Sequence, residues 1–106
     1  MRKASRAFLT ALLEARGPSG HEQPVQDVVR KYVNSFAESV VTDVHGNVAA
    51  VVNPGGRPRI LLAGHCDQIG FMVQHIDDSG FISFGGIGGH DIAVLIGQHV
   101  VVCGGQ

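Results

Sequence analysis

The sequence predicts an α/β layer that passes into a β-rich unit. Up to residue 36, apolar residues recur every three or four positions, which is the period of amphipathic helices. A continuous apolar run then begins at Ile60 and stops at Gly64, which is typical of a buried strand. Beyond residue 70, short apolar runs alternate with turn-forming residues, so we expect mainly strands there.

Two amphipathic helices are predicted, over residues 3–15 and 22–36, because apolar side chains line one face of each. Gly17-Pro18 ends the first helix, since neither residue continues a helix readily. Ser19 and Glu22 fit the S-x-x-E capping box. We therefore expect both residues to cap the second helix rather than to act in catalysis.

A β-hairpin is expected after the helices, with strands at residues 40–44 and 48–52 around the turn His45-Gly46-Asn47. Asn53-Pro54-Gly55-Gly56 then ends the second strand, before the apolar run that begins at Ile60. His45 is expected to lie in water at the turn, without a functional role.

Four strands are expected in the β-rich part, at residues 71–76, 81–84, 92–96 and 100–103. The first two are expected to pair as a second hairpin around the turn Asp77-Asp78-Ser79-Gly80. The glycines of residues 85–89 do not have the spacing of a dinucleotide-binding loop, so they are expected to form a loop with unusual backbone angles. Because a self-contained domain rarely stops in a strand that runs into a turn, we expect an amino-terminal piece of a longer protein.

The composition of the 106 residues limits the classes of partner. A formal net charge of −1 and eight Lys and Arg residues give no electrostatic footprint for nucleic acid or an anionic membrane. No apolar stretch approaches the roughly 20 residues that span a bilayer. Cys66 and Cys103 form neither a CxxC unit nor a disulfide framework, so a reducing, intracellular compartment is expected.

His65 and Asp67 are the residues best suited to chemistry, because they follow the strand that begins at Ile60. In open α/β sheets, ligands bind beyond the carboxyl ends of the strands. A neutral imidazole is a common zinc ligand, and a nearby carboxylate can set its tautomer by accepting the other ring N–H. A catalytic zinc needs about three protein ligands, so spacing alone leaves a metal role and a structural role for His65 open.

The remaining histidines are weaker candidates. His90 lies beside Asp91 in the glycine-rich segment, and both a structural role and a contact with a ligand or substrate stay open for it. For the others, packing or exposure to water is the expected role; they are His21, His45, His75 and His99.

Five motifs occur in one order along nearly the whole chain. They are Gly17-Pro18-Ser19-Gly20-x-Glu22, Asp43–Asn47, Leu62–Val73, His75–Phe81 and Ile87-Gly88-Gly89. Together they resemble the amino-terminal third of the tetrahedral (TET) dinuclear-metal aminopeptidases, the family that includes glutamyl aminopeptidases and proteins once labelled cellulase M.

The resemblance implies a fold in two parts. Residues 1–69 would be the amino-terminal part of a catalytic α/β domain and would start a three-layer α/β/α core like that of zinc peptidases. Residues 70–106 would be the incomplete beginning of an inserted β-rich dimerisation domain. Dimers of this kind would assemble into dodecamers.

The resemblance also implies a cytoplasmic metallo-aminopeptidase that removes amino-terminal residues from peptides with a metal-activated water. Two divalent ions, zinc or cobalt, would bind in each active site. His65 would bind one of them, and Asp67 would take part in catalysis by orienting His65. The other ligands and the glutamate base come later in the family, so the 106 residues alone are expected to be inactive.

Two alternatives stay open. The first is a non-catalytic oligomerisation module that pairs with a partner through its β-rich half. The second is a related dinuclear-metal deacylase or peptidase with a different substrate. Three residues depart from the family pattern: Gln68 stands where Glu is frequent, His90 where an aromatic residue is common, and Cys66 where an apolar residue is usual. Beside a metal ligand, the Cys66 thiol could be readily oxidised or bind soft metals.

Overall fold

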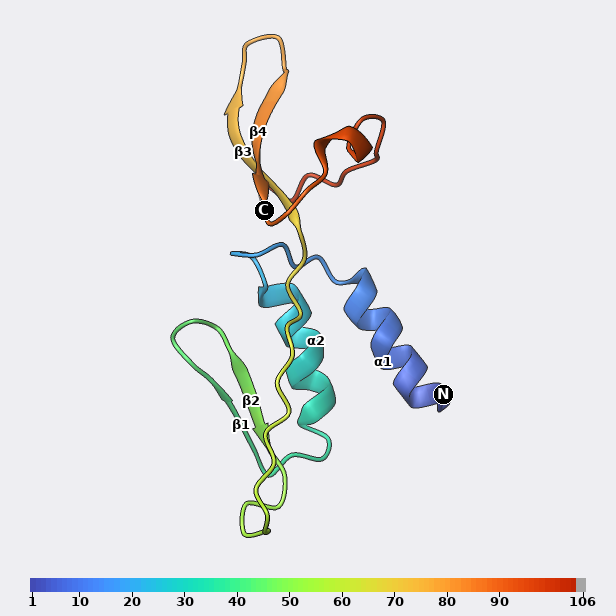
Figure 1. The fold of residues 1–106 in the computed structure, drawn as a ribbon, viewed down its shortest axis with the longest axis vertical. Coiled ribbons are helices and arrows are strands. Elements are labelled where there is room, and N and C mark those ends of the chain that lie inside the picture. Colours follow the sequence, from blue (N-terminus) through green and yellow to red (C-terminus); the bar gives the residue numbers. More distant parts are fainter. Residues whose placement is uncertain (105–106) are drawn as a thin grey trace. The chain divides into compact units, whose positions relative to one another are not determined.

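The computed structural model describes residues 1–104, in which the chain forms two compact units that meet between Gln68 and Ile69 (Figure 1). The first unit contains the helices α1 (Lys3–Glu14) and α2 (Gln23–Val33) and the strands β1 (Ser39–Thr42) and β2 (Val48–Val51). The second unit contains β3 (Gly70–Ile76), β4 (Ile82–Ile87) and the short 3-10 helix η1 (Ile92–Val94). This part of the chain is therefore a small α/β arrangement.

The structure confirms both predicted helices. Helix α2 ends at Val33, three residues before the predicted end, and the chain continues in turns as far as Phe36. The apolar faces of the helices meet where Phe8 stacks on Tyr32, with ring centroids 3.9 Å apart, and Phe36 packs edge-on against the same ring. Within residues 1–104, neither helix has the length and apolar character needed to cross a membrane.

The predicted capping box at Ser19 and Glu22 is wrong. Glu22 is itself the N-cap of α2, and among the described residues no side chain caps this helix. Ser19 lies four residues before the first residue of the helix and so is not at the capping position. Its hydroxyl donates a hydrogen bond to Asp67 instead. The carboxylate of Glu22 accepts a hydrogen bond from the backbone N–H of Gly20 at 2.7 Å.

Close packing occurs where the loop before α2 meets the helix. Val25, which is 2% exposed, is the one fully buried side chain in residues 1–104. Gly17 lies against it, and a Cβ atom at Gly17 would approach Val25 Cγ1 to 2.5 Å. A glycine is therefore needed at this position for the loop to approach the helix.

The predicted first hairpin is confirmed. Strands β1 and β2 are antiparallel, with Ser39 opposite Val51 and Thr42 opposite Val48. The carboxylate of Asp43 holds the turn by accepting hydrogen bonds from the backbone N–H groups of His45 and Asn47 and from the side-chain amide of Asn47. His45 is exposed, as predicted.

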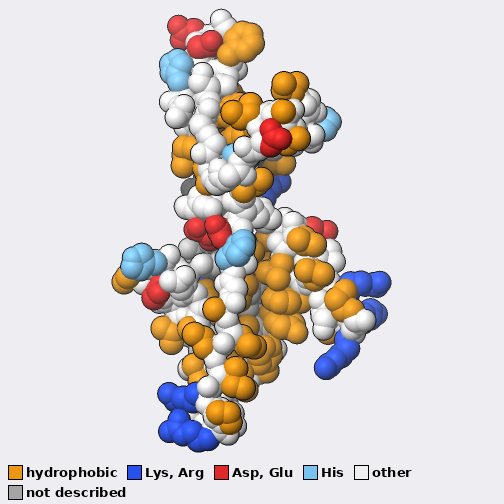
Figure 2. All heavy atoms as spheres, viewed as in Figure 1, with side chains coloured by type: hydrophobic (Ala, Val, Ile, Leu, Met, Phe, Trp, Pro, Cys, Tyr) orange, Lys and Arg blue, Asp and Glu red, His pale blue; other side chains and the backbone are white. Residues whose placement is uncertain are grey.

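The predicted buried strand that begins at Ile60 is wrong. Residues 60–67 pair with no strand in the described part of the chain, and β1 and β2 pair only with each other there. The side chains of Ile60, Leu61 and Leu62 are 79%, 89% and 91% exposed, and Figure 2 shows hydrophobic side chains open to solvent. A strand needs neighbours for its N–H and C=O groups, and none lies beside this run among residues 1–104.

Residues 60–67 instead run past α2 without regular secondary structure (Figure 1). With α2 and β2 they line an open groove of about 1030 Å³. His65 and Asp67 lie at the end of this segment.

The second predicted hairpin is also confirmed, with Gly70 opposite Ile87 and an irregularity between Val73 and His75. Strand β4 extends through Gly85 and Gly86, which were predicted to lie in a loop; of the predicted loop glycines, Gly88 has a positive φ, +81°. A Cβ at Gly86 would lie 3.0 Å from Cδ2 of His90, so the absence of a side chain there leaves space for the imidazole.

The predicted strands at residues 92–96 and 100–103 are wrong. Residues Ile92–Val94 form η1, whose first turn is capped by the carboxylate of Asp91, which accepts from the N–H of Ala93. No strand follows Ile87 within residues 1–104. Without a neighbouring strand, these apolar runs have no ladder of hydrogen bonds to join, and at residues 92–94 the cap from Asp91 favours a helical turn instead.

Candidate metal-ligand site

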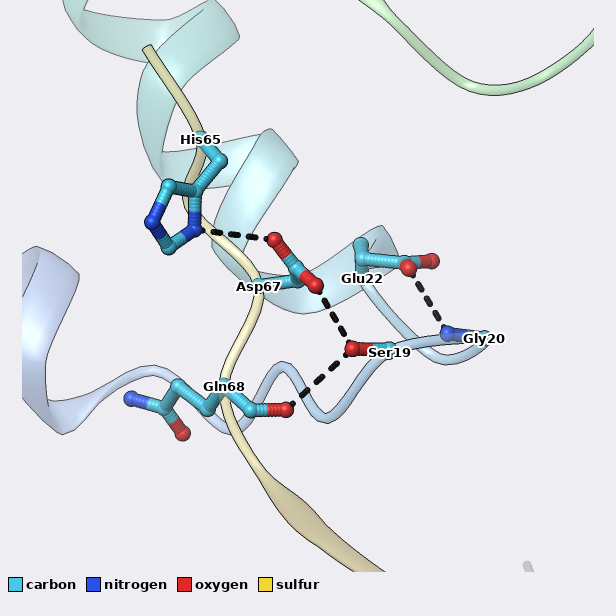
Figure 3. A network of polar contacts seen from close by, with 6 residues as sticks. All are labelled: Ser19, Gly20, Glu22, His65, Asp67 and Gln68. Atoms are coloured by element: carbon cyan, nitrogen blue, oxygen red, sulfur yellow. Dashed lines mark hydrogen bonds and ion pairs between the residues drawn. The ribbon is translucent and has the colours of Figure 1, made fainter. Parts of the chain in front are cut away.

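His65 presents an exposed imidazole, with 86% of its side chain accessible to solvent. Its Nδ1 atom lies 3.0 Å from Oδ1 of Asp67. Because a carboxylate only accepts hydrogen bonds, this contact favours the tautomer with the proton on Nδ1. Figure 3 shows the other ring nitrogen, Nε2, on the side facing away from Asp67. The lone pair of Nε2 is thus directed to where a ligand or metal can approach.

Asp67 uses both carboxylate oxygens. Oδ1 faces His65, and Oδ2 accepts a hydrogen bond from the hydroxyl of Ser19 at 2.6 Å. These contacts lower the pKa of Asp67, the bond from Ser19 more than the bond from His65, because both stabilise the ionised carboxylate. Asp67 therefore remains an acceptor throughout the neutral range.

The backbone places Ser19 beside Asp67. Pro18 forms a parallel bridge with Gln68, in which the N–H of Gln68 donates to the carbonyl of Gly17 at 2.8 Å. The N–H of Ser19 donates to the carbonyl of Gln68 at 3.1 Å. The loop between α1 and α2 is consequently held alongside residues 67–68, as Figure 3 shows.

Ser19 is the residue that reading the sequence missed. It belongs to a Gly-Pro-Ser-Gly motif, but it lies 48 positions from Asp67, so spacing gives no signal of their contact. Its local pattern suggested a capping box, which the structure does not form. Its partnership with Asp67 becomes visible only in the folded chain.

Among the described residues, one side chain is suited to be a ligand of a metal ion. His65 can offer Nε2 to an ion, and Asp67 holds the ring in the tautomer that this requires. Within residues 1–104, no group of three or more His, Cys, Asp or Glu side chains could hold a metal ion. A catalytic zinc takes about three protein ligands, so the described residues by themselves do not form a complete zinc site.

Cys66, between the two site residues, is less reactive than its position in the sequence suggested. Partial burial raises the pKa of its thiol, and the negative charges of Asp67 and Glu22 raise it further. Since the thiolate is the species that is oxidised, the raised pKa disfavours oxidation of Cys66 at neutral pH.

His90 has structural contacts in the second unit. Its Nε2 atom lies 2.9 Å from the carbonyl oxygen of Gly70, and its ring stacks on Phe71 with centroids 5.0 Å apart. Of the two roles left open for His90, the structure thus supplies the structural one. The remaining four histidines are exposed, as expected; they are His21, His45, His75 and His99.

Comparisons with known proteins bear on this geometry. The profile of the M42 glutamyl aminopeptidase family matches residues 46–106, which include His65 and Asp67. The crystal structure of a TET aminopeptidase from a marine sediment thaumarchaeon is 40% identical and covers 91% of this chain and 27% of its own, with a TM-score of 0.84.

Two curated relatives are named for different hydrolase activities. The lysyl aminopeptidase of Pyrococcus furiosus is 37% identical over 94 residues, which are 88% of this chain and 27% of the relative. A protein of Thermococcus kodakarensis, provisionally named a LysW-lysine and LysW-ornithine hydrolase, is 36% identical over 72 residues, or 67% of this chain and 21% of the relative. The chain thus spans about a quarter of the length of the curated relatives that it matches. With the family profile covering more than half of its residues, the chain belongs to the M42 glutamyl aminopeptidase family, as its motifs indicated.

Proposed function

We propose that these residues belong to a metal-dependent aminopeptidase that removes residues from the amino ends of peptides. Membership of the M42 family supports this proposal. The observation that carries it is the contact between His65 and Asp67, an exposed imidazole with one nitrogen held by a carboxylate and the other turned away from it. This is the arrangement of a metal-ligating histidine.

In this proposal, His65 donates the lone pair of Nε2 to one of two divalent ions, zinc or cobalt. Asp67 keeps the proton on Nδ1, raises the basicity of Nε2 and limits rotation of the ring. Asp67 thus acts through His65 and is a positioning residue. The ions, when bound, would activate water and polarise the scissile carbonyl. Because the described residues supply one ligand, we propose that the 106 residues alone are inactive.

The same proposal extends to architecture. Residues 1–69 would form the amino-terminal part of the catalytic domain, a three-layer α/β/α core, in which the apolar run 60–62 would be covered on both faces. The exposure of Ile60, Leu61 and Leu62 supports this assignment, because such a run is normally buried. Residues 70–106 would begin an inserted β-rich domain through which cytoplasmic dimers form and assemble into dodecamers.

The proposal is tested with variants of the intact protein. His65→Ala should lose one metal ion per active site and nearly all hydrolysis of amino-acid anilides, because the ion loses a protein ligand. Asp67→Asn leaves the ligand His65 in place but removes the carboxylate that orients it, so this variant should bind metal about 10–100-fold more weakly. Metal content by mass spectrometry and initial rates measure these effects. His45→Ala, which removes another exposed histidine, is the matched control. Normal metal content and turnover in both site variants would contradict the proposal.

A second candidate is a related hydrolase with the same His65–Asp67 arrangement and a different substrate. The similarity to the protein named a LysW-lysine and LysW-ornithine hydrolase favours it. Assays of the intact protein with amino-acid anilides and with acylated amino acids separate the two candidates. Faster cleavage of the acylated substrates would favour the second.

A further inference from the structure

We propose that Ser19 is a positioning residue of the metal site. Its hydroxyl holds the carboxylate of Asp67 in place, and that carboxylate in turn orients the ring of His65. The inference rests on the proposed function, since it assumes that His65 binds a metal ion. It names a residue outside the segment matched by the family profile. The carrying observation is a chain of two hydrogen bonds, from Ser19 to Asp67 and between Asp67 and His65 (Figure 3).

The Ser19 bond restricts a torsion that is otherwise loose. The terminal torsion of an aspartate side chain has a broad, weak preference. The Asp67 side chain is 38% exposed, so water can compete for its oxygens. With Oδ2 held at 2.6 Å by Ser19, Oδ1 is kept toward Nδ1 of His65 at 3.0 Å. Ser19 thus makes the carboxylate a directed acceptor.

The hydroxyl of Ser19 has two acceptors within reach but one proton to donate. The carbonyl oxygen of Gln68 lies 3.4 Å away, and Oδ2 of Asp67 lies 2.6 Å away. The shorter contact has the ionised acceptor, and such charge-assisted bonds are the stronger ones. The proton therefore belongs to the bond with Asp67.

The loop that carries Ser19 is held independently of this hydroxyl. Its backbone is bonded to Gln68 on both sides of Pro18, and Gly17 packs closely against Val25. Removing the hydroxyl therefore leaves the loop in place and changes only the restraint on Asp67. This separation makes the role of the side chain testable.

Removal of the Ser19 hydroxyl has two opposing effects on the affinity for the metal ion. Without the bond from Ser19, the carboxylate keeps more negative charge, which would strengthen its contact with His65. It also rotates freely and shares its oxygens with water. Because Asp67 is partly exposed, solvent screens the gain in charge, and the loss of orientation dominates. The expected result is weaker metal binding.

Competition between the metal-free intact protein and a chelator for zinc or cobalt measures this loss. Ser19→Ala should bind the ion about 3–10-fold more weakly, less than the loss expected for Asp67→Asn. Ser19→Thr, which keeps a hydroxyl, should restore the affinity. The control is Ser35→Ala, which removes a hydroxyl that donates to the carbonyl of Tyr32 at 2.8 Å.

Two readouts distinguish positioning from general structural support. Nitrogen NMR of the His65 ring in the metal-free protein should show less of the Nδ1–H tautomer in Ser19→Ala than in Ser19→Thr. In a double-mutant cycle, adding Ser19→Ala to Asp67→Asn should change the affinity by no more than about twofold, because Ser19 acts through the carboxylate.

Unchanged or tighter binding by Ser19→Ala would overturn the inference, as would losses that multiply in the double variant. Failure of Ser19→Ala to fold while Ser19→Thr folds would assign Ser19 a structural role and also overturn it. If His65→Ala retains all metal, the proposed function itself fails. If His65→Ala loses metal and Ser19→Ala does not, only the inference about Ser19 fails.

Discussion

Replacing Gly17 by alanine should loosen the loop before α2. The new Cβ would lie 2.5 Å from Cγ1 and 3.1 Å from Cβ of Val25. Val25 is 2% exposed, and a β-branched side chain on a helix has one strongly preferred rotamer, so it cannot turn away. Overpacking of this kind costs about 1–3 kcal/mol. Gly17 lies outside the left-handed region of φ, so alanine recovers about 0.4–1 kcal/mol by restricting the unfolded chain.

With an overpacking cost of about 2 kcal/mol, the middle of that range, the net destabilisation of the loop is about 1–1.6 kcal/mol, or a factor of about 5–15 in its opening equilibrium. Amide hydrogen exchange of the intact protein measures this opening locally. The reporting groups are the N–H of Gln68, bonded to Gly17, and the N–H of Ser19, bonded to Gln68. Both should exchange faster by that factor. Gly55→Ala is the control, because a Cβ at Gly55 would meet open space.

A double variant identifies the cause. In a Val25→Ala background Cγ1 is absent and only the 3.1 Å approach to Cβ remains, so adding Gly17→Ala should cost much less than it does beside Val25. Exchange in Gly17→Ala no faster than in Gly55→Ala would refute the reasoning. An equal acceleration with and without Val25→Ala would also refute it, because the clash with Val25 would not be its source.

Two predictions concern the hairpin turns. The pKa of Asp43 is lowered, chiefly by the side-chain amide of Asn47, so the carboxylate supports β1–β2 above the ordinary aspartate pKa and loses that support as the pH falls through its folded value. Carbon NMR should show the Asp43 midpoint rising in Asn47→Ala; an unchanged midpoint would contradict this cause. Asp77 accepts hydrogen bonds from the N–H groups of Ser79 and Phe81 at the tip of β3–β4, so Asp77→Ala should speed exchange there by about 2–10-fold. Asp78→Ala is the neighbouring control, and equal effects of the two substitutions would be inconsistent with the turn assignment.

Local patterns were sufficient for the helices and hairpins. The helix period predicted α1 and α2, and turn-forming residues predicted both hairpins, because the hydrogen bonds of these elements join residues close in sequence. The contact between His65 and Asp67 could also be predicted from the sequence, since the side chains of two residues in an extended chain can meet across one intervening position. These features depend on neighbours along the chain.

The features that were predicted wrongly depend on contacts between residues that are far apart in the sequence. Ser19 and Glu22 match a local capping signal, yet the hydroxyl of Ser19 bonds to an aspartate 48 residues away. No periodicity encodes that meeting, which follows from the parallel bridge between Pro18 and Gln68.

The apolar runs at residues 60–63, 92–96 and 100–103 depend on distant partners in the same way. Their composition indicated strands, but a strand exists only when its N–H and C=O groups find a neighbouring strand. In residues 1–104 these runs have no such neighbour; residues 92–94 form η1, residues 95–96 lie in a turn, and the other runs have no regular secondary structure. Helical and hairpin segments, whose hydrogen bonds close locally, are thus encoded in the sequence, whereas sheet membership and the Ser19–Asp67 contact arise only when distant segments meet.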